Sequence, residues 1–255
     1  MDKETGLVIL TDVIKDNKRH QDYEHITELA DKYYKMKTGD DITDLLEKIV
    51  TRETKEEFEQ REDISKSVVP SILNSTQLPF QKAIRKQPLL REILYKGQDK
   101  TDDLEQKINT FWGQKSLEEY LEYALVDYNY IDPNAFLITE FDQFDSNTEK
   151  ASPYPFVATS YEAIMYEYKN EDLQYLIVQL PIKFMENEAE QDGFKYTMYL
   201  GEFTLQMVQV GADFVSDLDK IQIGEKYFTY EEFNPKANKV PAARFGYLRD
   251  AETKG

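Results

Sequence analysis

Residues 132–141 read DPNAFLITEF, and the character of the chain changes there. Asp-Pro-Asn is a turn signal, and the residues after it are apolar and favour β-strands. Patterns before this point are typical of amphipathic helices, whereas patterns after it are typical of short strands. The sequence therefore predicts an α+β fold, with a helical N-terminal half followed by a mainly antiparallel β-sheet.

In the helical N-terminal half, residues 22–37 have the pattern of an amphipathic helix, and Gly39 stands where this helix is expected to end. Asp40 or Asp41 can cap a second helix carrying apolar residues up to position 49. Thr54-x-x-Glu57 has the form of a capping box, which predicts that a helix restarts there.

Prolines then divide the chain at Pro70, Pro79 and Pro88. Pro88 followed by Gly97 predicts a compact helix over residues 88–96. Two further helical patterns between residues 104 and 128 carry enough apolar residues to be part of a core.

The second half predicts five to seven strands, joined by short connections with turn residues, such as residues 169–172 and 191–193. These strands are expected within eight runs rich in β-forming residues, at 135–141, 156–159, 162–168, 173–180, 196–200, 203–210, 227–230 and 240–248. We expect a helical region over 1–128 and a β-rich region over 129–255, either as two parts or as layers of one domain.

Composition excludes several classes of function. The formal net charge is -18, which disfavours tight binding to a nucleic-acid backbone, and the absence of cysteine excludes disulfides and thiolate sites. The apolar run Leu7–Leu10 near the N-terminus is too short for a membrane span. The wide spacing of the glycines excludes glycine-loop phosphate motifs, so no cofactor is expected.

Residue patterns for catalysis or metal binding are weak. His20 and His25 are five positions apart, which does not match zinc-binding helices. Residues 142–149 begin like a calcium loop but lack its glycine and final glutamate, and Asp213, Asp217 and Asp219 have no basic or histidine partner nearby. We therefore expect no enzyme activity and no metal; a carboxylate-based or metal-assisted enzyme is the third alternative.

One stretch of the acidic chain is basic. Between Ile64 and Gln98 bases outnumber acids, and its candidate contacts for an acidic partner or DNA are Lys82, Arg85, Lys86 and Arg91. The other interpretation is an ordinary solvated helix face.

Three segments together resemble the N-terminal part of a tailed-phage portal protein, of the kind common in phages of Bacteroidetes. The first runs from Arg61 through Pro70 to Leu89, similar to the helical segment that enters the portal wing. The second covers residues 120–141, where a helix leads into Asp132-Pro133-Asn134 and a first wing strand. The third, residues 238–250, reads NKVPAARFGYLRD and is similar to the strand that closes the portal sheet.

The resemblance implies a structural virion protein and no enzyme activity. It implies a homo-oligomeric ring of about a dozen subunits at the capsid vertex, through which DNA is packaged and ejected. Its partners would be capsid, scaffold or connector proteins and, transiently, double-stranded DNA, with no membrane; the protein would be assembled in the host cytoplasm and localised in the virion. Portals of this kind continue into a stem, a clip and a crown after the third motif, whereas this sequence ends at Gly255.

The alternative is a non-catalytic protein-binding module with an aromatic-rich sheet face. Its contact residues would be Tyr161, Tyr166, Tyr168, Tyr196 and Tyr199.

Overall fold

The structure is a computed structural model of the 255-residue chain. It describes residues 1–46, 52–86, 128, 131–141, 153–186, 189–210, 220–233 and 239–245. Its helices are α1 (Lys3–Lys15), α2 (Tyr23–Thr38), the short 3₁₀ helix η1 (Ile42–Leu45) and α3 (Lys55–Lys86).

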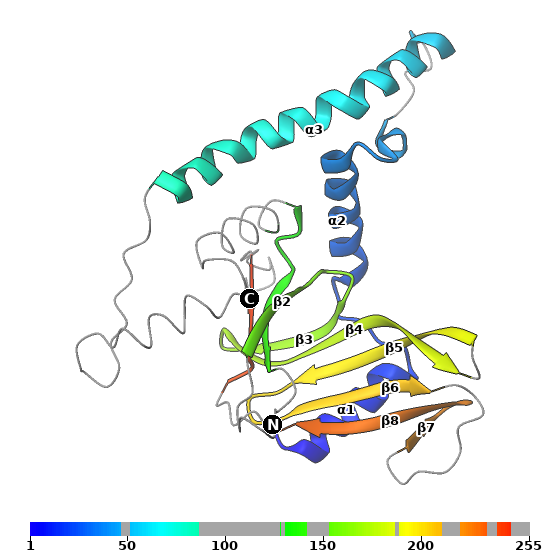
Figure 1. The fold of residues 1–255 in the computed structure, drawn as a ribbon, viewed down its shortest axis with the longest axis vertical. Helices are drawn as coiled ribbons and strands as arrows, with labels where there is room; N and C mark the ends of the chain where they lie inside the picture. The colour runs from blue at the N-terminus through cyan, green and yellow to red at the C-terminus, as the bar shows by residue number, and fades with distance from the viewer. Residues whose placement is uncertain are drawn as a thin grey trace. The chain divides into compact units, whose positions relative to one another are not determined.

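The described residues also form nine strands in two antiparallel sheets, which confirms the α+β class (Figure 1). A six-stranded sheet has the order β3-β4-β5-β6-β8-β7, and a three-stranded sheet has the order β2-β1-β9. The strands are β1 (Phe136–Phe141), β2 (Pro153–Ala158), β3 (Ala163–Lys169), β4 (Asp172–Glu186), β5 (Ala189–Tyr199), β6 (Thr204–Val210), β7 (Lys220–Ile223), β8 (Lys226–Phe233) and β9 (Ala242–Arg244).

These elements belong to two compact units. The sheet unit contains residues 1–24 and 135–244, whereas the helical unit contains the described residues between His25 and Asn134 together with Phe245. Along the sequence, α1, α2, η1 and α3 all precede residue 128, and all nine described strands follow it. The sheet unit nevertheless takes in α1 from the N-terminal end, because this helix buries its apolar face on the sheet.

The sequence prediction missed α1. Asp2 caps this helix by accepting a hydrogen bond from the Thr5 N–H at 2.8 Å, and Leu10 and Val13 are buried in the core. Gly6 brings the helix close to the sheet, since a β-carbon there would lie 2.9 Å from Leu200 Cδ1. Figure 1 shows α1 lying across strands β6 and β8.

The six-stranded sheet is covered on both faces. Side chains alternate along β4, so Ile177 packs in the core that contains α1, whereas Leu176 and Val178 pack in the core that contains β1. In β5, Met198 and Tyr199 divide between the same two cores. All five side chains are buried, so the centre of this sheet is the interior of a three-layer unit.

In the helical unit, α2 ends at the predicted Gly39. Its backbone has φ +79°, and its N–H donates to the Lys35 carbonyl at 2.9 Å, as in a left-handed helix cap. A β-carbon at Gly39 would overlap the Lys66 carbonyl oxygen of α3 and approach Pro70 Cγ to 3.2 Å. Because Pro70 has no N–H, it cannot donate the usual helical hydrogen bond to the Lys66 carbonyl. Gly39 lies beside this carbonyl, where only a residue without a side chain fits.

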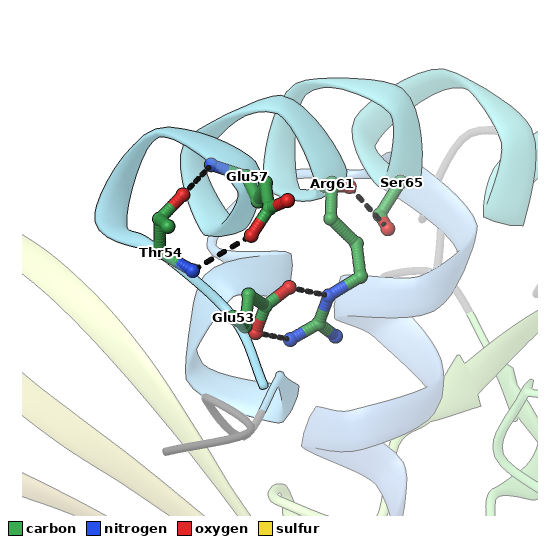
Figure 2. Close-up of polar contacts among 5 residues, drawn as sticks. All are labelled: Glu53, Thr54, Glu57, Arg61 and Ser65. Atoms are coloured by element: carbon green, nitrogen blue, oxygen red, sulfur yellow. Dashed lines mark hydrogen bonds and ion pairs between the residues drawn. The ribbon is translucent and has the colours of Figure 1, made fainter. Parts of the chain in front are cut away.

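The predicted capping box begins α3, as Figure 2 shows. The Glu57 N–H donates to Thr54 Oγ1 at 3.2 Å, and the Thr54 N–H donates to Glu57 Oε2 at 2.8 Å. Two hydrogen bonds of 2.8 and 2.9 Å from Arg61 to Glu53 fasten the preceding residue to the next turn of the helix. Local contacts therefore stabilise the start of α3, and the capping box among them is predicted from the sequence.

Several finer predictions were wrong. The described residues contain nine strands instead of the expected five to seven, because each of the eight β-forming runs carries a strand and β7 lies outside all of these runs. Residues 191–193 are not a turn but part of β5, where they pair with β4. Helix α3 continues through Pro70 and Pro79 instead of breaking at them. The described part of the helix predicted after Asp41 forms the short η1, and the Asp41 side chain makes no cap hydrogen bond there. The predicted helices over 88–96 and 104–128 lie outside the described residues, except for position 128.

Candidate functional site

Two of the three portal-like segments lie side by side in the sheet unit. Strand β1 carries the end of the second segment, and β9 carries the middle of the third. These two strands pair antiparallel, with Phe136 opposite Arg244 and Ile138 opposite Ala242. The Thr139 N–H also donates to the Pro241 carbonyl at 2.9 Å. About a hundred residues separate these segments in sequence, so their pairing is a tertiary feature.

Three of the four predicted basic residues, Lys82, Arg85 and Lys86, fall on α3, which carries most of the first portal-like segment. Lys82 is exposed, and Arg85 and Lys86 occupy the last turn of the helix. Arg91 lies outside the described residues. Farther back along α3, Lys66 is already paired with Glu62 at 3.0 Å and with Asp63 at 3.4 Å.

Helix α3 has a half-buried face and an exposed apolar face. Phe58, Ser65, Val69 and Leu73 lie on the half-buried face. The opposite side exposes large apolar side chains to solvent, which are Ile64 (60%), Val68 (44%), Ile72 (58%) and Leu78 (44%). The sequence prediction missed this face, although its apolar residues recur at helical spacing.

Small residues form the middle of the exposed face. An open groove of about 430 Å³ is lined, among the described residues, by Ser67, Val68, Ser71, Ile72, Ser75 and Thr76. The Ser71 hydroxyl donates to the Ser67 carbonyl at 2.7 Å, and the Ser75 hydroxyl donates to the Ser71 carbonyl at 2.7 Å. Because these hydroxyls are satisfied within the helix, the groove can take an apolar side chain without leaving their donors unpaired.

Charge is divided along α3. Residues 55–70 carry five acids (Glu56, Glu57, Glu59, Glu62, Asp63) and three bases (Lys55, Arg61, Lys66). Residues 71–86 carry three bases (Lys82, Arg85, Lys86) and no acid. The helix is therefore acidic at its start and basic at its end.

A separate aromatic cluster surrounds His20 in the sheet unit. The His20 ring lies 4.6 Å from the Tyr166 ring and 5.4 Å from the Tyr23 ring. The Arg244 guanidinium lies over the Tyr166 ring at 5.4 Å. The backbone N–H of His20 donates to the backbone carbonyl of Ile164 at 2.9 Å, at a point where β3 shifts register against β4. The segment before α2 therefore pairs with β3 at Ile164, near the start of this edge strand.

Burial lowers the pKa of the His20 side chain in the folded protein. Its side chain is only 9% exposed, and removal from water lowers its pKa to about 4. The Asp22 carboxylate opposes this shift, whereas the Arg244 guanidinium adds to it. His20 is therefore neutral in the folded protein at neutral pH.

We expect acid to weaken the fold through His20. The unfolded chain takes up a proton below pH 6.5 and the folded chain does so only near pH 4, so stability present above pH 6.5 is lost as pH falls between these values. From pH 7 to pH 5 the free energy of unfolding should fall by about 1–2 kcal/mol. Urea unfolding at several pH values measures this change.

The substitution His20→Phe keeps a ring beside Tyr166 and should flatten the pH dependence between pH 7 and 5. His25→Gln, at an exposed position, is the matched control and should leave it unchanged. The pKa values of the Asp2 and Glu62 carboxyl groups are lowered from their usual 3.8 and 4.5. These two groups therefore change the stability at a lower pH than His20 does. An unchanged slope in His20→Phe would contradict the assignment.

An open groove of about 470 Å³ lies beside the β3–β4 turn and β9. Its described lining includes Tyr168, Glu171, Leu173, Val240 and Ala243. Lys239 pairs with Asp172 across it at 3.1 Å.

The other residues that were predicted to bind a partner or a metal do not form one common site among the described residues. Tyr196 and Tyr199 are buried in the core, which corrects the expectation that they contact a partner, and Tyr166 is half-buried. Tyr161 and Tyr168 are each 40% exposed. The described residues contain no cluster of metal-ligating side chains, and the acidic residues at 142–149 and 213–219 lie outside the described part.

Fold and surface define this chain as an α+β protein with an exposed, charge-divided helix. No protein-family model matches the chain, and no curated protein matches it significantly. Among the described residues, no helix is long and apolar enough to cross a membrane.

Proposed function

We propose that this chain is a structural protein of a virion, built like the wing of a tailed-phage portal. In this proposal it forms part of a ring at the capsid vertex through which DNA is packaged and ejected. Capsid, scaffold or connector proteins would contact the wing, and double-stranded DNA would pass transiently. The protein would have no enzyme activity.

The pairing of β1 with β9 carries the proposal. The resemblance assigns these two segments to the first strand of the portal wing and to the strand that closes its sheet. In this chain they are neighbours, with Leu137 opposite Ala243, despite their separation in sequence. This pairing supports the proposal because the resemblance implies that the two segments belong to one sheet.

Charge supports the same proposal. A net charge of -18 repels DNA phosphates at long range, and a conduit must let DNA slide without gripping it. The basic end of α3, which carries Lys82, is the proposed contact to an acidic neighbour or to DNA.

Light scattering of the purified chain across a range of concentration and salt tests the proposal. A ring should appear as a mass about twelve times the 30.0 kDa of one chain, or as growth toward that mass with concentration. Electron microscopy of the same sample should show closed rings. A mass that stays at 30.0 kDa at the highest concentration would contradict ring formation by this chain.

The second candidate is a non-catalytic binding module, which the exposed aromatic residues of the sheet unit favour. Tyr161, Tyr168 and Phe194 are each 40% exposed, and aromatic side chains on a surface are typical of protein contacts. A strict monomer that loses its partner when Tyr161 and Tyr168 are changed to serine would support this alternative.

A further inference from the structure

Residues 19–22, here named the connector, lie between the end of α1 and the start of α2, against the edge of the six-stranded sheet. Hydrogen bonds dock the connector and the first residue of α2 on this sheet. They include the bonds from the His20 backbone N–H to the Ile164 carbonyl at 2.9 Å, from Arg19 Nη2 to Gln179 Oε1 at 2.9 Å and from the Tyr23 hydroxyl to the Tyr161 carbonyl at 2.8 Å. The connector is therefore held by contacts to β3, to β4 and to the turn before β3.

Helix α1 ends independently of the connector. Asn17 has φ +50°, and the Lys18 N–H donates to the Val13 carbonyl at 3.0 Å, so the last turn of α1 is closed by its own backbone. Leu10 and Val13 fix the helix in the core of the sheet unit. The connector can therefore leave the sheet without unwinding α1 and without removing these side chains from the core.

His20 is the buried titratable side chain of the connector. It is only 9% exposed, and its ring lies between those of Tyr166 at 4.6 Å and Tyr23 at 5.4 Å. Of the charged groups that act on it, the Asp22 carboxylate in the connector favours the imidazolium form, and the Arg244 guanidinium on β9 opposes it. Burial outweighs the effect of Asp22, so the docked site holds the neutral form of the ring.

We propose that the connector is an acid-sensitive device, docked on β3 and β4 at neutral pH and increasingly released as the pH falls, while the core of the sheet unit stays folded. Release breaks the hydrogen bonds to the sheet and turns an ordered link between α1 and α2 into a flexible one. Acid therefore opens the chain first at the connector and not by unfolding of the whole sheet unit. This device does not require ring formation, so it goes beyond the proposed function.

Linkage gives the size of the acid effect. In the released connector the His20 imidazole is in water and takes up a proton near its ordinary pKa of 6.5, whereas the docked ring does so only near pH 4. The docked state is therefore favoured above pH 6.5, and this advantage is lost as the pH falls toward 4. Between pH 7 and pH 5 the equilibrium constant for release should rise about twentyfold.

Native-state hydrogen exchange of the full chain at low urea concentrations tests the proposal. After correction for the intrinsic exchange rate at each pH, the opening constant of the His20 backbone N–H should rise about twentyfold from pH 7 to pH 5. It should hardly depend on urea, because a local opening exposes little surface. Amides of the central strands β5 and β6 should exchange through a larger opening that does depend on urea. An equal opening constant and an equal urea dependence for His20 and for these strands would overturn the proposal.

Two variants separate the acid response from docking itself. His20→Phe keeps a ring beside Tyr166, and it should reduce the twentyfold rise to less than about twofold because nothing at this position then titrates. Tyr23→Phe removes the hydrogen bond to the Tyr161 carbonyl and should raise the opening constant about fivefold at both pH values, with the twentyfold rise retained. His25→Gln, at an exposed position, is the matched control and should behave like the unaltered chain.

The variants also give results that would contradict the device. A twentyfold rise that persists in His20→Phe would show that another group drives the opening. An opening constant at His20 that is unchanged in Tyr23→Phe at both pH values would show that this hydrogen bond does not dock the connector. Each variant is compared with the unaltered chain at the same protein concentration, so that association does not differ between the samples.

Discussion

Replacing Leu10 with alanine is expected to lower the free energy of unfolding of the sheet unit by about 2–5 kcal/mol. The side chain is fully buried between α1 and the six-stranded sheet, in a core that also contains Met198 and Leu205. Removing three carbon atoms there loses their transfer free energy and leaves a cavity that the sheet cannot close by moving. Equilibrium urea unfolding followed by circular dichroism measures the loss.

Val8→Ala is the matched control, because Val8 lies on the same helix but is 60% exposed. Its expected effect is within about 0.5 kcal/mol. Hydrogen exchange should show faster exchange in the central strands β5 and β6 of Leu10→Ala and no change in the control. An equal, small loss in both variants would show that α1 does not contribute to the core.

Replacing Gly39 with alanine is expected to cost the helical unit about 2–5 kcal/mol, from two separate causes. The positive φ of +79° disfavours any L-residue with a side chain. In addition, the new methyl group would overlap the Lys66 carbonyl oxygen, which belongs to the backbone and cannot turn away. Helices α2 and α3 must then separate.

Gly224→Ala isolates the backbone cost. Gly224 also has a positive φ, +62°, but a β-carbon there has no neighbouring atom within 4 Å. This variant should lose about 1–2 kcal/mol, from backbone strain alone. Losses of equal size in Gly39→Ala and Gly224→Ala, measured by thermal unfolding, would contradict the close contact between Gly39 and α3.

Local signals in the sequence were sufficient where the structure depends on neighbours in the chain. The α2 stop at Gly39 and the Thr54–Glu57 capping box join residues within four positions of each other. The hairpin between β3 and β4 was also predicted, and its Asn170 and Glu171 both have positive φ as a tight turn requires. Such features are confirmed because their hydrogen bonds join residues that are close in sequence and do not depend on tertiary contacts.

Two elements had usable signals that were not recognised. Helix α1 has Asp2 as its cap and apolar residues at helical spacing, but the run Leu7–Leu10 was considered only as a membrane span, for which it is too short. Strand β7 is joined to β8 by the two residues Gly224 and Glu225, with Ile223 opposite Lys226, a common hairpin pattern. The candidate surface on α3 was partly predicted through Lys82, but its exposed apolar face was not.

What the sequence determined by itself is therefore the α+β class, the principal turns and caps, and the acidic, cysteine-free character of the chain. Tertiary structure alone decided the pairing of β1 with β9, the burial of Tyr196 and Tyr199, and the packing of α1 on the sheet. It also decided that α3 passes through Pro70, because the missing N–H leaves a carbonyl beside which Gly39 fits. These outcomes depend on contacts between residues far apart in the chain, whose free energy exceeds local preference only after the elements have packed.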